Sequence, residues 1–203
     1  EEIAYVDGYD IQALEALKND IRQVEGVTHM AVGNGIPGST NAPMELSLAT
    51  LEGMNENERI ELYRGSGDSE FLELLDLEFI MGGNFSKTQS DSLAPIIVNQ
   101  ALLQNLPWKE DPIGRKIELF NMLGRSMGVR RIVGVVGDFH MESLHNRIRP
   151  AVFTHTERAY NVLIRFQTDH VDRLRDEIVT ILNKYRGNFA GDFYFLRSDL
   201  NAQ

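Results

Sequence analysis

The two ends of this 203-residue chain carry the same pattern, a strand, an amphipathic helix and a second strand. At the N-terminal end, strands are expected at 3–6 and 27–32, on either side of a helix with Asp10 as its N-cap and Gly26 at its end. The apolar positions of this helix recur at helical spacing and are Ile11, Leu14, Leu17, Ile21 and Val24.

The C-terminal end repeats the unit, with strands expected at 161–166 and 193–196. Between them runs an apolar helical stripe of Val171, Leu174, Ile178, Ile181, Leu182 and Tyr185. Two βαβ units pairing into one sheet would form a ferredoxin-like lobe, split because both chain ends build it. The predicted fold class is α+β with two lobes, the second being a mixed α+β insertion.

The middle of the chain contains weaker signals for short elements. Breaker-rich segments at 33–38 and 65–67 are interpreted as a loop and a boundary. Strands are predicted at 44–51, 60–63, 96–98, 115–120 and 130–138, and short helices near 69–75 and 100–106.

Composition excludes several classes of protein. A net charge of -10 disfavours a surface for phosphate backbones, so nucleic acid is not an expected partner. Cysteine is absent, which excludes disulfides and thiolate metal sites. No apolar run reaches the ~18 residues that cross a bilayer. The chain opens at Glu1 without the pattern of a signal peptide, and we therefore expect a piece of a longer protein.

Residues 33–38, Gly-Asn-Gly-Ile-Pro-Gly, match the G-x-G-x-x-G pattern of dinucleotide-binding turns. That chemistry needs a helix directly after the turn, because the pyrophosphate binds at the helix N-terminus. Here Pro37 lies within the turn and a strand follows, so the pattern favours a Gly/Pro loop. No cofactor is expected.

Residues 124–128, Gly-Arg-Ser-Met-Gly, match the G-x-S-x-G nucleophile elbow, and Asp138 and His140 follow in hydrolase order. An elbow passes from a strand into a helix, whereas 129–136 reads as a strand. The glycines more simply close a β-hairpin. No catalytic residue is expected, with Ser126 as the best candidate nucleophile should the chain be an enzyme.

Asp138, His140 and His145 are candidate metal ligands by residue type, but they lack the i, i+4 spacing of a helical pair, and no metal is expected. The acidic run at 52–61 is interpreted as solvated charge. Trp108 is interpreted as a core or interface anchor.

From Phe79 onward a series of motifs appears in a specific order over about 70 residues. They are Gly82-Gly83-Asn84-Phe85-Ser86, Pro95-Ile96-Ile97-Val98-Asn99, Asp111-Pro112-Ile113-Gly114, Ile132-Val133-Gly134-Val135-Val136, Asp138-Phe139-His140, Ser143-Leu144-His145 and Pro150. In this series the chain resembles the periplasmic core domain of MacB-like, FtsX-like ABC-transporter permeases, especially those of Bacteroidetes. Asn84, Gln100 and Gly137 stand where that family commonly has Arg, Glu and Lys.

The resemblance implies a porter-like lobe at 1–62 plus 158–203 and an inserted Sabre-like lobe at 63–157. It implies the periplasmic domain of an inner-membrane protein, whose transmembrane helices lie outside this sequence, and a role in export or efflux. The implied partners are an ABC ATPase reached through the transmembrane part, a second copy in the full-length protein, and a periplasmic adaptor. The ATPase is a separate component, and no Walker motif occurs here.

Two further functions stay open. A lipoprotein-release permease domain would handle lipidated cargo and needs a sizeable exposed apolar patch or groove. A ligand-sensing extracytoplasmic domain needs a pocket with convergent polar groups. The residues that bind a ligand or a partner are not predicted.

Overall fold

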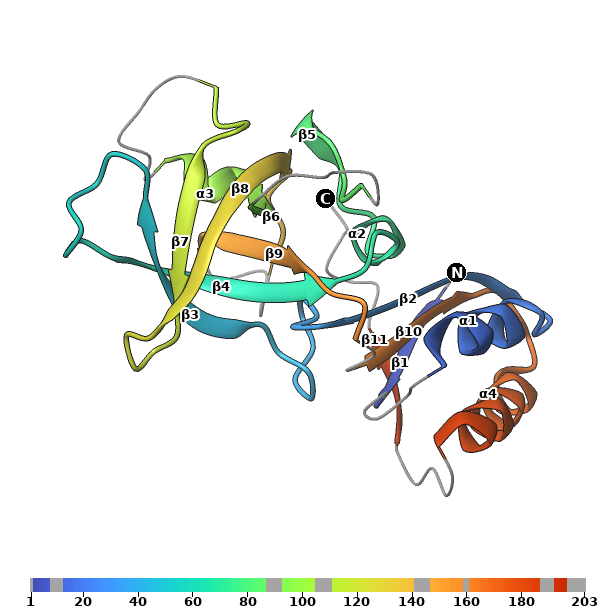
Figure 1. Cartoon of the computed structure of the whole chain (residues 1–203). Coiled ribbons are helices and arrows are strands. Elements are labelled where there is room, and N and C mark those ends of the chain that lie inside the picture. Colours follow the sequence, from blue (N-terminus) through green and yellow to red (C-terminus); the bar gives the residue numbers. More distant parts are fainter. Residues whose placement is uncertain are drawn as a thin grey trace.

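The computed structural model describes residues 2–7, 13–86, 93–104, 111–140, 147–158, 161–186 and 192–196, which form a mixed α+β fold with a large sheet and few helices (Figure 1). The strands are β1 (Glu2–Asp7), β2 (Val27–Asn34), β3 (Glu45–Leu51), β4 (Ile60–Gly67), β5 (Phe79–Gly82), β6 (Ala94–Asn99), β7 (Lys116–Phe120), β8 (Ser126–Val136), β9 (Ala151–His155), β10 (Asn161–Phe166) and β11 (Phe193–Leu196). The helices are α1 (Leu14–Arg22), α2 (Phe71–Leu74), α3 (Gln100–Leu103) and α4 (Val171–Arg186).

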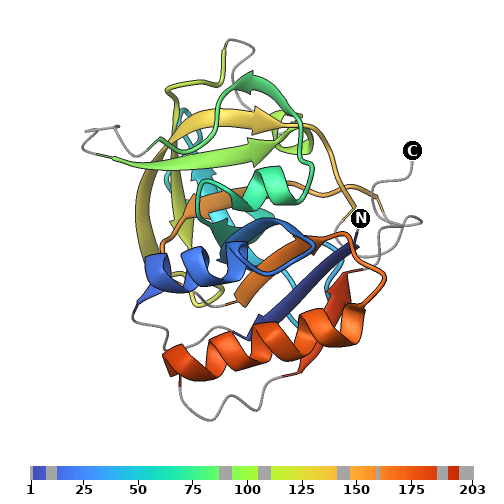
Figure 2. The ribbon, with the colours of Figure 1, turned by 90° about the vertical axis from the view of Figure 1, so that its right-hand side faces the viewer.

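Both ends of the chain build one antiparallel four-stranded sheet, in the order β11-β1-β10-β2. Helices α1 and α4 pack on one face of this sheet (Figures 1 and 2), because their apolar side chains recur every three or four residues. We call these four strands and two helices the end unit. Its helix-side core consists of Ala4, Val6, Leu17, Ile21, Val24, Met30, Val32, Val162, Ile164, Phe166, Leu174, Ile178 and Leu182.

The helix that the sequence predicts at the N-terminal end is present as α1, which begins at Leu14 with Ala13 as its N-cap. The predicted cap, Asp10, and the predicted apolar position Ile11 lie outside the described residues. Burying each large aliphatic side chain of this core stabilises the fold by about 1.5–3 kcal/mol. Packing of the two helices on the sheet therefore stabilises the end unit.

The middle of the chain builds a six-stranded sheet that closes on itself, in the order β4-β3-β7-β8-β6-β9 and back to β4. The β6–β8 and β4–β9 pairs are parallel and the other four are antiparallel. We call this element the closed sheet. Because side chains alternate across a strand, every strand contributes to one interior. That interior contains Ala49, Leu51, Leu62, Ile96, Val98, Leu102, Ile117, Leu119, Ile132, Val135 and Val152.

The end unit and the closed sheet meet at a short ladder between β2 and β4, where Gly33 pairs with Gly67 and Asn34 pairs with Ser66. The segment 68–76, which contains α2, follows this ladder directly. We call the ladder and this segment the junction. Side chains from both units share a core around it, including Tyr5, Ala31, Ile36, Phe71, Leu72, Leu74, Phe139, Phe153 and Leu163.

Two strands were not predicted from the sequence, and several others extend beyond their predicted bounds, β4 and β8 by four residues each at one end. No residue of β5 is buried, and the first three residues of β9 are buried in a row, so neither strand has the alternation of a half-buried strand. β4 continues through 65–67, which the glycines had marked as a boundary. The predicted division at 62/63 falls inside β4, whose neighbours β3 and β9 both belong to the closed sheet. The division into 1–62 plus 158–203 and 63–157 stays a prediction.

Candidate functional site

Ser126 lies in a β-hairpin, as its flanking glycines predict. It is the first residue of β8, and a strand follows it. Its Oγ donates a hydrogen bond to Glu118 Oε1 (2.6 Å) and accepts one from Gly128 N (3.1 Å). Asp138 and His140 lie beyond the other end of β8, roughly 30 Å along the strand. A nucleophile needs its base within about 3 Å, so these residues do not form a hydrolase triad.

Asp138 instead stabilises a helix end. Its Oδ1 accepts a hydrogen bond from Ala101 N (2.6 Å) in the first turn of α3. Two other candidates, His145 and Trp108, lie outside the described residues. Within the described ranges, no group of three His, Cys, Asp or Glu side chains is placed to hold a metal ion.

The carboxylates of the acidic run at 52–61 form hydrogen bonds with nearby side chains. Glu52 accepts a hydrogen bond from Arg115 (3.1 Å), and this bond lowers the pKa of the Glu52 carboxyl. Glu58 accepts one from the side chain of Asn55 (2.9 Å). Glu56, Glu58 and Glu61 are exposed, in agreement with the interpretation as solvated charge, whereas Glu52 is half-buried.

The glycine-rich segment at 33–38 begins where β2 lies close to β4. No helix follows it, and the next element is β3. A Cβ atom on Gly33 would lie 2.4 Å from Ser66 O and 2.5 Å from the Phe71 ring, closer than real Cβ atoms come. A Cβ atom on Gly67 would lie 2.3 Å from the Phe71 side chain. The glycines thus let β2 approach β4 under Phe71, and the segment lacks the helix that dinucleotide binding requires.

A buried ion pair connects the end unit to the junction. Lys18 Nζ of α1 contacts Asp68 Oδ2, and the two side chains are only 7% and 6% exposed. Asp68 also accepts hydrogen bonds from Val32 N (3.2 Å) and Glu70 N (3.1 Å). Its own N–H donates to Val32 O (3.0 Å). One carboxylate thereby holds α1, β2 and the start of α2 together.

Burial raises the pKa of the Asp68 carboxyl above its ordinary value, while the Lys18 ammonium and the Val32 N–H act in the opposite direction. A buried charge of this kind is costly when it loses its partner, whereas the intact pair is close to neutral in free energy. The pair therefore specifies one arrangement of the two units more than it adds stability.

Two further ion pairs, more exposed than the first, connect the same parts. Arg22 of α1 donates to both carboxylate oxygens of Glu70 (2.6 and 2.7 Å). Arg165 of β10 contacts Asp76 (2.5 Å) and donates to the carbonyl of Leu74. In all three pairs the cation belongs to the end unit and the carboxylate to segment 68–76. The junction is thus held by burial, glycine packing and three ion pairs.

The sequence patterns missed Lys18 and Asp68, although a signal was present. Lys18 follows Leu17 directly and lies four residues after Leu14, on the apolar stripe of the predicted helix. A lysine on a buried helix face requires a carboxylate partner. The partner could not be identified, because it lies 50 residues away in the chain.

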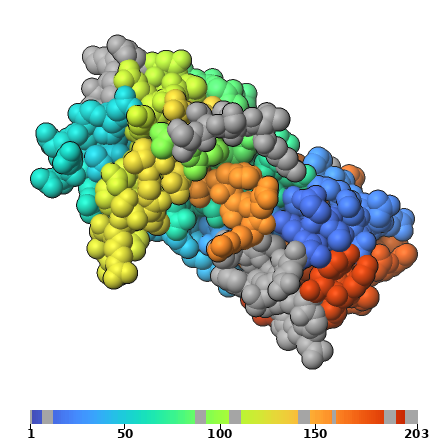
Figure 3. All heavy atoms as spheres, viewed as in Figure 1, coloured from blue at the N-terminus to red at the C-terminus, as the bar shows by residue number. Residues whose placement is uncertain are grey.

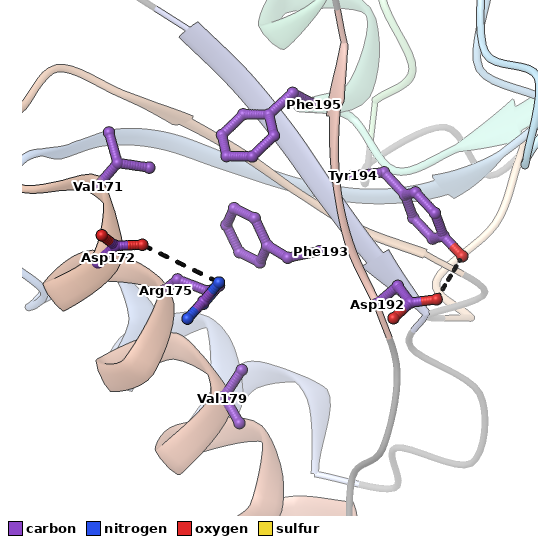
Figure 4. A pocket seen from close by; sticks show the side chains of 8 residues that line it. All are labelled: Val171, Asp172, Arg175, Val179, Asp192, Phe193, Tyr194 and Phe195. Carbon is purple, nitrogen blue, oxygen red and sulfur yellow. Dashed lines mark hydrogen bonds and ion pairs between the residues drawn. The ribbon is translucent and has the colours of Figure 1, made fainter.

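A groove of about 550 Å³ lies between α4 and β11 (Figure 4). Phe193 and Phe195 of β11 face Val171 and Val179 of α4, and Phe195 is half exposed. Arg175 faces Asp172 of its own helix (4.0 Å). The groove mixes apolar and charged side chains, and it is the candidate site for a small ligand.

Comparison with solved structures identifies the fold of this chain. No family model and no curated protein matches the sequence. No helix in the described part of the chain has the length and apolar character to cross a membrane. The periplasmic region of MacB from Actinobacillus actinomycetemcomitans is similar in structure, with a TM-score of 0.62 and 13% identity. The similarity covers 98% of this chain and 89% of that one.

Two further solved structures are similar over nearly the whole chain. The extracellular domain of the ABC-type transporter YknZ from Gram-positive bacteria has a TM-score of 0.60 and 14% identity, covering 97% of this chain and 98% of that one. A domain of a protein described as a permease from Porphyromonas gingivalis has a TM-score of 0.61 and 13% identity, covering 100% and 92%. This chain therefore has the fold shared by these periplasmic and extracellular domains of ABC-transporter permeases.

Proposed function

We propose that this chain is the extracytoplasmic domain of an ABC-transporter permease, that it is non-catalytic, and that it passes ATP-driven movement of the membrane part to export or to a periplasmic adaptor. The observation that carries the proposal is the likeness in fold to three such domains over 97% or more of the chain. The ordered motifs from Phe79 onward support it independently.

The position of the first and last strands supports the proposal. Ile3 of β1 is the ladder partner of Leu196 of β11, so the start of β1 and the end of β11 lie side by side. Adjacent ends suit a domain placed between two membrane helices of a longer chain. In that arrangement the end unit lies nearer the membrane and the closed sheet projects away from it.

The end unit corresponds in this proposal to the porter-like lobe, and the closed sheet with α2 and α3 to the inserted Sabre-like lobe. The strand order β11-β1-β10-β2 supports a split ferredoxin-like lobe, since both βαβ units contribute to one sheet. We place β3 and β4 with the inserted lobe because of their ladder partners.

The junction suits the transmission of movement. Two units joined by a buried ion pair and interlocked backbones move as one rigid body, so rotation of the membrane helices displaces the far end of the closed sheet. The partners in this mechanism are an ABC ATPase acting through the membrane part, a second copy in the full-length permease, and an adaptor.

The two other functions are lipoprotein release and ligand sensing, and the groove between α4 and β11 is where either would take place. Acyl chains or a small ligand bound there would contact Phe195 and Val179. Protection of Phe195→Cys from a thiol reagent by an added lipopeptide would favour lipoprotein release over the proposal.

Labelling in intact cells tests the proposal. Glu56 is exposed in the closed sheet and the 203 residues contain no cysteine, so Glu56→Cys in the complete protein provides one reactive thiol in this domain. We expect a membrane-impermeant maleimide to label it without lysis, with the unsubstituted protein as control. Labelling only after lysis would contradict an extracytoplasmic position.

A further inference from the structure

The turn between β7 and β8 presents two large apolar side chains to solvent. Leu123 is 81% exposed and Met122 is 50% exposed. The turn projects from the closed sheet, on the side away from the end unit (Figure 3, yellow, lower left). Exposing such side chains at a narrow tip has no benefit for folding, because neither contributes to a core.

This turn is held in one shape. The Asn121 Oδ1 accepts hydrogen bonds from Leu123 N and Arg125 N (both 3.0 Å). Backbone bonds join Asn121 N to Arg125 O (3.0 Å) and Gly124 N to Asn121 O (2.8 Å), and Gly124 has φ of 76°. The tip is therefore preorganised, which lowers the entropy cost of binding.

The hairpin is basic in an acidic protein. Residues 116–131 contain Lys116, Arg125, Arg130 and Arg131 against the single carboxylate of Glu118, whereas the chain carries -10 overall. The guanidinium of Arg59 lies 3.9 Å from the Phe120 ring centroid, beside the turn. Arg59 and Arg125 thus place positive charge beside the apolar tip, whereas Lys116 and Arg131 pair at the opposite end of the hairpin.

We propose that the β7–β8 hairpin is a docking element for a protein partner, whose apolar pocket, bordered by Asp or Glu side chains, accepts Met122 and Leu123. Charge complementarity supports this partner, because the basic hairpin steers an acidic surface to this end of the molecule. A bilayer is disfavoured on two grounds. Two apolar side chains give weak membrane binding, and, resting here on the proposed function, the tip points away from the membrane.

The experiment uses a photo-crosslinking amino acid at position 123 of the complete protein in its own cells, with position 80 as the matched site. Ile80 is also an exposed apolar residue, 44% accessible, on β5. We expect a crosslink to one protein from 123 and not from 80. That protein is then purified, and its affinity for this chain is measured.

The double variant Met122→Ser/Leu123→Ser is expected to weaken this affinity by about tenfold or more, and Arg125→Glu to slow association and reduce its salt dependence. Ile80→Ser is the control and leaves the affinity unchanged. Equal crosslinking from 80, equal affinity of the double variant, or a crosslink only to a second copy would overturn the proposal.

Binding of vesicles with one-third anionic phospholipid by the wild-type chain, abolished in the double variant, would replace the protein partner with a membrane. None of these results depends on maleimide labelling of Glu56→Cys. Failure of the docking proposal and failure of the proposed function are therefore distinguishable.

Discussion

The junction buries charged side chains, whereas the β7–β8 tip exposes apolar ones. At the junction, Lys18 and Asp68 are buried together and Gly33 allows two backbones to touch. At the tip, Leu123 is exposed, and local hydrogen bonds keep the turn in shape. At the junction the charged groups contact each other, whereas at the tip Arg125 is exposed to solvent.

The difference separates two roles. Substitutions at the junction should change stability and the relation between the two units, because its groups are satisfied by each other. Substitutions of Met122 and Leu123 at the tip should change binding and leave the fold intact, because both side chains are exposed. Measuring the stability of variants at both places therefore tests whether the residues that stabilise the fold are separate from those that bind a partner.

Breaking the buried ion pair should have the largest effect. Lys18→Met leaves the Asp68 carboxylate buried without its cation, and we expect a loss of about 3–5 kcal/mol in the free energy of unfolding. Urea denaturation followed by circular dichroism measures this loss.

The double variant Lys18→Met/Asp68→Leu removes both charges and should recover most of that stability. Because Asp68 also accepts backbone hydrogen bonds, recovery should be incomplete. A double variant no more stable than Lys18→Met would show that those backbone bonds, and not the ion pair, dominate.

Crowding the β2–β4 crossing should have the next largest effect. A methyl group on Gly33 would meet the Ser66 carbonyl and the Phe71 ring, and we expect Gly33→Ala to cost about 1–3 kcal/mol. Gly83→Ala is the matched control, since no atom lies within 4 Å of its added Cβ. Equal losses in the two variants would contradict the close approach at the junction.

A surface link between the helices should have a small, pH-dependent effect. Hydrogen bonds from Lys184 and Tyr185 lower the pKa of the Asp20 carboxyl. Its contribution is thus present above the ordinary aspartate pKa of about 4 and is lost as the pH falls through the lowered value.

We expect Asp20→Asn to lower the melting temperature by about 1 °C at pH 7, as exposed pairs contribute little. The difference from wild type should vanish at low pH. A difference that grows on acidification would have the wrong sign for this contact.

The tip should have the smallest effect on stability. Met122→Ser/Leu123→Ser changes exposed side chains only, so the free energy of unfolding should stay within about 0.5 kcal/mol of wild type. A loss above 2 kcal/mol would show that the tip contributes to the fold, and the contrast with the junction would fail.

Local pattern was sufficient for the end unit but not for the middle of the chain. The stripe of Leu17, Ile21, Leu174 and Ile178 predicts α1 and α4, because helical period is a local property. Closure of the six-stranded sheet depends on the parallel β4–β9 pair, whose partners lie about 90 residues apart, as at Tyr63 and Ala151. No local pattern specifies that pairing.

In the candidate site, too, some features were predictable from local sequence and others were not. The absence of a helix after Gly38 and after Gly128 was predictable, because strand alternation follows both motifs. The role of Asp68 was not, since a lone aspartate after a glycine looks like an ordinary turn residue. Its meaning comes from Lys18, which the fold brings beside it.

The distance between the two units is the most direct test of the central claim, that the end unit and the closed sheet form one rigid body. Spin labels at Gln23→Cys in the end unit and Glu56→Cys in the closed sheet are unambiguous, because the chain has no other cysteine. Double electron–electron resonance should give one narrow distance distribution for this chain and a broader one with Lys18→Met added. A broad or two-peaked distribution in the otherwise wild-type chain would contradict the claim.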